Sequence, residues 1–151
     1  MYIMKVHLTK ANIIGIVSGA VSFCLAFFIT SKMVTKCTSN GKDNLSFMTE
    51  LCKEASHNPS IMIDQETRLD SVCIIDGKSF CYNYTLINLS KDDLDCNSIA
   101  SNVDPIVRNN ALTMKGTEIF RKRAIPLTYR YFDKNGELVH SIYVSETEYK
   151  E

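Results

Sequence analysis

The first feature of the hydrophobic pattern is a long apolar run near the start of the chain. Residues 11–31 contain no charged side chain, and Lys10 and Lys32 stand directly on either side of them. As an α-helix, these 21 residues would span about 31 Å, which matches the hydrocarbon core of a bilayer. The pattern predicts a transmembrane helix over 11–31, between a cytoplasmic N-terminus (1–10) and a juxtamembrane linker (32–43).

A cleaved signal peptide is the alternative for the same run. The apolar region of a signal peptide is usually about 7–15 residues long, and small residues follow it at positions −3 and −1. The best cut here, after Ser31, puts Ile29 at −3, so the sequence favours a retained anchor. We expect a single-pass protein of the bacterial inner membrane with its C-terminal domain in the periplasm. The alternative is a protein secreted to the periplasm after cleavage.

Small residues recur on one face of the apolar run, at Ala11, Gly15 and Gly19. Such spacing lets two helix backbones approach closely, which favours helix dimers in membranes. The spacing therefore predicts a homo-oligomer that forms through the transmembrane helix. A monomer is the alternative, because small residues are common in membrane helices.

After the linker, the pattern alternates between helical and strand periodicity. Apolar residues recur at helical spacing over 44–56, from Ser90 to Val107 and over 115–123. We expect Asn44 to cap the first helix, Ser90 to cap the second, and Pro105 to kink or divide the second. A loop at 109–110 would follow it.

Stretches rich in β-branched and aromatic residues predict strands over 61–63, 68–75, 80–88, 125–132 and 137–146. The turn residues Asp76-Gly77 and Asn135-Gly136 join the last four into two hairpins. The predicted fold class is α+β: an antiparallel sheet of two hairpins with two to three helices packed on it. This periplasmic domain would cover 44–146, and a flexible tail would follow over 147–151.

The charge distribution excludes one class of partner. Four of the 17 basic residues, and no acidic residue, fall within the first 36 positions, so the rest of the chain has a formal charge of −4. Binding to nucleic acid needs clustered positive charge that faces the phosphates. We therefore expect no nucleic-acid partner.

Six cysteines indicate an oxidising compartment. One, Cys24, lies within the apolar run, and the other five follow it without the spacing of a zinc site. A five-residue loop would place Cys73 opposite Cys81, whereas a shift of one residue would put them on opposite faces. The preferred second pair is Cys52 with Cys96, although other pairings stay open. Cys37, close to the bilayer, is a candidate for a disulfide between chains.

Four tyrosines occupy alternate positions in two predicted strands: Tyr82, Tyr84, Tyr129 and Tyr131. Side chains two apart in a strand share one face, so these rings form either part of the core or an aromatic binding surface. His140 alternates with Leu138 and Ile142, which favours a structural histidine. No catalytic motif, metal site or cofactor site is evident, and we predict none.

Four short patterns carry a resemblance over residues 59–145. They are I-D-x-x-T-x-L-x-S from Ile63, Y-x-Y-T-L from Tyr82, S-K-D-D-L-D from Ser90 and Y-x-Y-x-D-x-x-G from Tyr129. In these the chain resembles small anchored or exported bacterial envelope proteins of unassigned function. The resemblance implies a periplasmic α+β domain and no catalytic residues.

These observations lead to a functional hypothesis. The chain is expected to be a membrane-anchored periplasmic module that binds another envelope protein, as an accessory or structural component of a secretion or conjugation system. One alternative is an immunity or exclusion protein that inhibits a toxin or phage at the membrane. Another is a small periplasmic enzyme or ligand-binding protein that uses His140 or the tyrosines.

Overall fold

The computed structural model describes residues 43–57 and 60–150. The predicted transmembrane helix over 11–31 lies outside the described residues, as do its face of Ala11, Gly15 and Gly19 and the linker thiol Cys37. The side chain of Cys96 lies outside them as well. Within the described ranges, no helix is both long enough and apolar enough to cross a bilayer.

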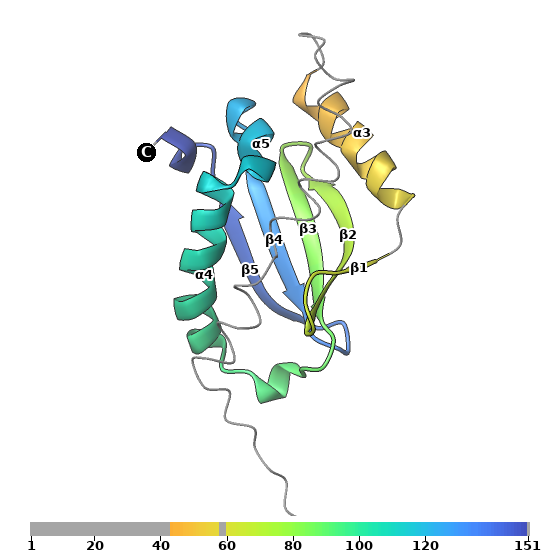
Figure 1. Ribbon diagram of the computed structural model, residues 1–151, viewed down its shortest axis with the longest axis vertical. Helices are drawn as coiled ribbons and strands as arrows, with labels where there is room; N and C mark the ends of the chain where they lie inside the picture. Colours follow the sequence, from red (N-terminus) through yellow and green to blue (C-terminus); the bar gives the residue numbers. More distant parts are fainter. Residues whose placement is uncertain (1–42, 58–59, 151) are drawn as a thin grey trace, which may run out of the picture.

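The described residues form an α+β domain (Figure 1). The α-helices are α3 (Asn44–Ser56), α4 (Cys96–Thr113) and α5 (Glu118–Lys122). The strands are β1 (Ile61–Met62), β2 (Thr67–Ile75), β3 (Ser79–Leu86), β4 (Leu127–Phe132) and β5 (Leu138–Val144). Short 3₁₀ turns complete the fold: η1 (Lys91–Asp93), η2 (Lys115–Thr117) and η3 (Glu148–Lys150).

The sheet has the strand order β1-β2-β3-β4-β5, and it is mixed rather than antiparallel. Both predicted hairpins are present, as β2–β3 and β4–β5, but β3 and β4 lie side by side in parallel. The prediction of a wholly antiparallel sheet was therefore wrong at this one boundary. The reason is the connection over 87–126, whose helices return the chain to the end of the sheet where β3 began, as parallel pairing requires.

The residues of the two turns explain where the chain reverses to form each hairpin. Asp76 and Gly77 both have positive φ angles, 52° and 69°, as in the type I′ turn that suits a hairpin. In the second turn, Asp133 Oδ1 accepts hydrogen bonds from the backbone N–H groups of Asn135 and Glu137, both at 2.8 Å. Its Oδ2 accepts a third from Lys91 N at 3.0 Å, which ties η1 to this end of the sheet.

Three details of the helices differ from the sequence predictions. Asp43, not Asn44, caps α3, because its Oδ1 accepts the N–H of Ser46 at 2.7 Å. Ser90 precedes the 3₁₀ turn η1, and α4 begins only at Cys96. In addition, α4 continues through Pro105 and through the predicted loop at 109–110.

Burial explains why Pro105 does not divide α4. An interior proline costs a helix about 3 kcal/mol. However, Ile99 and Val103 before it, and Val107 after it, are each no more than 6 % exposed. Burying one such side chain contributes roughly 1.5–3 kcal/mol, so the packing of this face on the sheet outweighs the proline.

Alternate residues of the strands form two different faces. The tyrosine face consists of Phe80, Tyr82, Tyr84, Leu127, Tyr129, Tyr131, Ile142 and Val144. The thiol face, on the other side, consists of Ser71, Cys73, Cys81, Asn83, Thr128, Arg130, Ser141 and Tyr143. All residues of the tyrosine face belong to the hydrophobic core.

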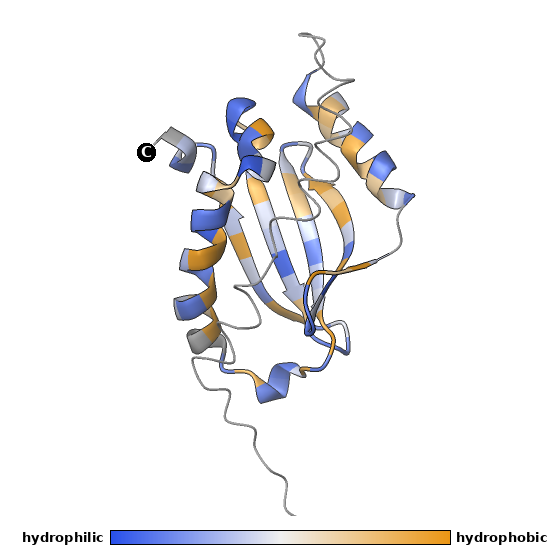
Figure 2. Cartoon of the chain, viewed as in Figure 1, coloured by the Kyte–Doolittle hydropathy of each residue, from blue (hydrophilic) through white to orange (hydrophobic). Residues whose placement is uncertain are grey.

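Helix α4 lies over the tyrosine face, and α3 lies beside β2. Figure 1 shows α3 beside β2 and α4 beside β5, and these are the strands that each helix contacts. Both helices alternate between hydrophobic and hydrophilic colouring along their length in Figure 2, as amphipathic helices do. The ring of Phe120 in α5 lies 5.1 Å from that of Phe80 and 6.1 Å from that of Phe47 in α3, so the helices share one core.

Two residues within the predicted tail over 147–151, Glu148 and Tyr149, contact the domain, whereas Glu151 lies outside the described residues. The hydroxyl of Tyr149 donates a hydrogen bond to the carbonyl of Ile125 at 2.8 Å. Arg108 of α4 donates to Glu148 Oε2 at 2.7 Å. These contacts join η3 to both α4 and the start of β4.

Candidate functional site: the β5 edge and the thiol face

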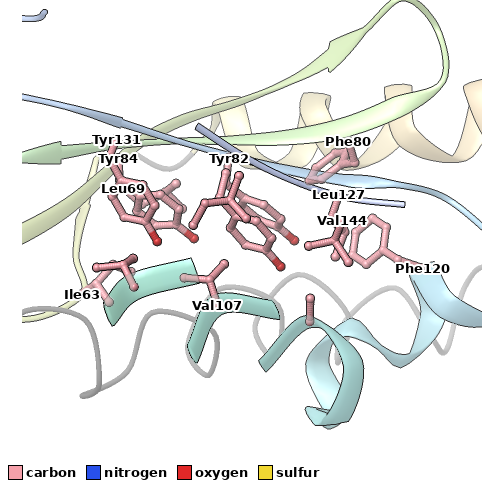
Figure 3. Packing of buried hydrophobic residues seen from close by; sticks show 14 of the residues in the cluster. Ile63, Leu69, Phe80, Tyr82, Tyr84, Val107, Phe120, Leu127, Tyr131 and Val144 are labelled. Carbon is pink, nitrogen blue, oxygen red and sulfur yellow. The ribbon is translucent and has the colours of Figure 1, made fainter. Parts of the chain in front are cut away.

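The four predicted tyrosines are core residues and not a binding surface. Their side chains are between 2 % and 4 % exposed. Tyr82 stacks on Tyr129 at 5.4 Å and Tyr84 on Tyr131 at 5.3 Å between ring centroids, across the parallel β3–β4 pair. Figure 3 shows the labelled tyrosine rings lying between the sheet and Val107 of α4, so the helix occupies the space that a partner would need.

Burial on this face has an electrostatic consequence. Loss of solvent raises the pKa of each tyrosine hydroxyl well above its ordinary value, and neighbouring tyrosines raise the pKa values of Tyr84 and Tyr129 further. The hydroxyls of Tyr129 and Tyr131 are buried without a hydrogen-bond partner among the described residues. The tetrad is therefore neutral at physiological pH and contributes to packing rather than to proton transfer.

His140 contacts an acidic side chain of α4. Its Nε2 lies 2.5 Å from Asp104 Oδ1 of α4, and the two side chains are 18 % and 29 % exposed. The pair joins α4 to β5.

The cysteine side chains among the described residues are not joined by disulfides. Cys73 and Cys81 are directly opposite each other in the β2–β3 register and on the same face, which is one of the two registers that the sequence left open. Both are free thiols, as is Cys52 in α3, so the structure contains no Cys73–Cys81 disulfide. The predicted pairing of Cys52 with Cys96 involves a side chain outside the described ones. In the part of the chain that the structure describes, no cluster of three or more His, Cys, Asp or Glu is arranged to hold a metal ion.

The polar side chain of Asn83 contacts both opposed thiols. Asn83 Nδ2 donates to Ser71 Oγ at 3.0 Å and lies 3.7 Å from Cys73 Sγ. Its Oδ1 accepts from Cys81 Sγ at 3.6 Å. Asn83 therefore orders the centre of the thiol face, and sequence analysis had not singled it out.

The edge of the sheet at β5 is the second feature that sequence analysis missed. β5 is the last strand in the sheet order, and within residues 43–57 and 60–150 no strand or backbone hydrogen bond joins its outer side. It is seven residues long, LVHSIYV, with no lysine, acidic residue or proline. Edge strands usually carry such residues to prevent pairing with other chains, so their absence was a readable signal.

Two large apolar side chains of β5 are exposed. Leu138 is 44 % and Tyr143 is 50 % exposed, and Ser141 between them is also exposed. Ile142 and Val144, which alternate with them, are buried under α4. One face of β5 therefore packs against α4, whereas its other face presents exposed side chains that carry no charge.

The comparisons with known proteins concern the fold. No family model matches the chain, and no curated protein matches it in sequence. A solved structure is similar: the crystal structure of a "putative secreted protein" from Pseudomonas aeruginosa, with a TM-score of 0.55 and 14 % sequence identity. The similarity covers 72 % of this chain and 98 % of that one. At this identity the likeness establishes a shared α+β fold.

Proposed function

We propose that this chain is a membrane-anchored, exported module that binds another protein of the bacterial envelope. In this proposal the partner adds an extended segment to the outer edge of β5. The observation that carries it is the composition and position of β5: a seven-residue edge strand with no lysine, arginine or acidic residue and with Leu138 and Tyr143 exposed.

Strand addition uses groups that this edge presents. The backbone N–H and C=O groups of an extended peptide pair with those of the edge, and side-chain contacts then select the partner. Tyr143 and Ser141 lie beside each other on the thiol face, where a partner residue would meet an aromatic ring and a hydroxyl. The opposite edge is less suited, because β1 pairs with β2 over only two residues.

Two observations support export and anchoring. The apolar run over 11–31 is long enough to cross a bilayer. The similar structure from Pseudomonas aeruginosa is that of a "putative secreted protein". In this proposal the module has an accessory role in an envelope assembly, such as a secretion or conjugation system, where it recognises an extended segment of a neighbour.

Site-specific photocrosslinking tests the binding edge. A photoreactive amino acid replaces Ser141 in the full chain, in the cells that produce it, and adducts are identified after irradiation. We expect one adduct with an envelope protein, and we expect Tyr143→Lys to reduce it at least several-fold, because a charge on an edge opposes pairing. Gln65→Lys is the matched control, since Gln65 is exposed in the turn at the other edge of the sheet.

The proposal fails if the photoreactive residue at position 141 gives no adduct. It also fails if Gln65→Lys reduces the adduct as much as Tyr143→Lys does. A separate measurement tests the location. A reporter fused after Glu151 should be active as a periplasmic enzyme, and activity confined to cytoplasmic reporters would contradict the proposed topology.

A further inference from the structure

Cys73 and Cys81 are placed so that a bond between them needs no movement of the backbone. Directly opposed residues in an antiparallel pair have Cα atoms about 4.5–5.5 Å apart. Disulfides join Cα atoms about 4.4–6.8 Å apart, so the observed register falls inside this range. Rotation of the two side chains toward each other is sufficient.

The contacts of Asn83 show that both sulfurs already turn the same way. One end of its amide lies 3.7 Å from Cys73 Sγ and the other end 3.6 Å from Cys81 Sγ. Both thiols therefore lie over β3 on the thiol face. Breaking these two weak contacts is the cost of bringing the sulfurs together, and sulfur hydrogen bonds are weak.

The two thiols differ in access to solvent. Cys73 is half-buried, whereas Cys81 is completely buried. Burial, followed by the nearby Cys73, raises the pKa of Cys81 to about 12, and Arg130 opposes this only in part. An external reagent therefore meets Cys73 first, and Cys81 is positioned to react second.

We infer that Cys73 and Cys81 form a redox-active dithiol, in which Cys73 exchanges with an external disulfide and Cys81 resolves the product. The oxidant is a small or protein disulfide, RSSR. The Cys73 thiolate attacks one sulfur of RSSR and releases one RS⁻. Cys81 then attacks the Cys73 sulfur of the mixed disulfide and releases the second RS⁻. The two cysteine protons pass to the leaving thiolates, so two thiols are oxidised while one disulfide is reduced.

Cys52 is the competing third thiol. It is partly buried in α3, and burial raises its pKa, with a smaller contribution from nearby Cys73. It does not share the strand register that sets Cys81 opposite Cys73. Cys52 therefore stays reduced while the strand pair oxidises.

A redox titration of the full chain in its membranes tests this inference. Samples are equilibrated with mixtures of glutathione and glutathione disulfide, quenched in acid, alkylated and mapped by mass spectrometry. We expect Cys73 and Cys81 to lose their labels together as the disulfide fraction rises, to yield one crosslinked peptide and to recover on reduction. Cys52 keeps its label. The inference is overturned if Cys73 and Cys81 both stay labelled in the most oxidising mixture, or if Cys73 is linked to another cysteine.

Serine variants test the order of the two steps. In C81S, Cys73 should accumulate a mixed disulfide with glutathione. In C73S, the buried Cys81 should form this mixed disulfide at least about ten-fold more slowly. C52S is the matched control and should titrate like the natural chain. Equal rates in C81S and C73S would overturn the assignment of Cys73 as the entry thiol. The two cysteines lie on β2 and β3, and β4 separates them from β5, so this result and the test of the binding edge are independent.

Discussion

The two faces of the sheet consist of alternate residues of the same strands, yet they lie in different surroundings. On the tyrosine face, residues such as Phe80 and Tyr84 are at most 2 % exposed and pack beneath helices. On the thiol face, Cys81 is buried at the centre, whereas Ser71 and Tyr143 nearer the edges are exposed. The tyrosine face is thus buried throughout, whereas the thiol face is buried at its centre and exposed toward its edges.

This contrast locates stability and chemistry in different places. The tyrosine face combines large buried rings with two hydroxyls that have no partner, which suits packing and not reaction. The thiol face holds two opposed thiols, an amide that contacts both and the exposed ring of Tyr143 on the edge strand. Substitutions on the two faces should therefore affect different measurements.

The largest expected effect comes from truncating a ring on the tyrosine face. Phe80→Ala removes a side chain that contacts the rings of Tyr82 and Phe120, and it should lower the free energy of unfolding by about 3–5 kcal/mol. Ser71→Ala on the thiol face is the comparison, and it should cost about 1 kcal/mol or less, since Ser71 is exposed. Chemical denaturation measures both, and equal losses would show that the two faces do not differ in this way.

An effect of intermediate size is expected from substitution of Asp133, a buried residue whose carboxyl accepts hydrogen bonds from backbone N–H groups. Burial alone would raise the pKa of its carboxyl, but the N–H groups of Lys91, Glu137 and Asn135 outweigh burial and lower it. A carboxyl with a lowered folded-state pKa stabilises the fold above its unfolded pKa, and this stability is lost as the pH falls through the folded value.

The measurement is the free energy of unfolding of the natural chain and of Asp133→Asn between neutral and strongly acidic pH. Asp133→Asn should be less stable at neutral pH, and the difference should shrink as the pH falls below the ordinary range of an aspartate. A difference that stays constant with pH would mean that the charged carboxylate is not what these N–H groups stabilise.

The smallest expected effect on the free energy of unfolding comes from removing a buried hydroxyl that lacks a hydrogen-bond partner among the described residues. Tyr131→Phe removes a hydroxyl that makes no hydrogen bond among the described residues and keeps the ring stacked on Tyr84. We expect the free energy of unfolding to stay the same or rise by up to about 1 kcal/mol, because the buried hydroxyl no longer lacks a partner. Thermal unfolding gives the sign. A loss above that size would reveal a hydrogen bond that the tyrosine face depends on.

Local signals were sufficient where a few neighbouring residues decide the conformation. The positive φ angles of Asp76 and Gly77 follow from residues that adopt this region most readily, so the first hairpin was predictable, whereas its exact register, and with it the opposition of Cys73 and Cys81, was not. The alternation of Tyr82 and Tyr84 likewise fixed that they share a face. It did not fix whether that face is covered, because the covering helix lies elsewhere in the chain.

The sequence by itself determined the class of the domain, its two hairpins and most strand positions, because turn residues and period-two patterns act over a few positions. Only the tertiary structure decided that β3 and β4 pair in parallel, that α4 continues through Pro105 and that β5 is left as an edge. Each of these depends on contacts between residues far apart in the chain. There, burial of a helix face against a sheet outweighs local preference.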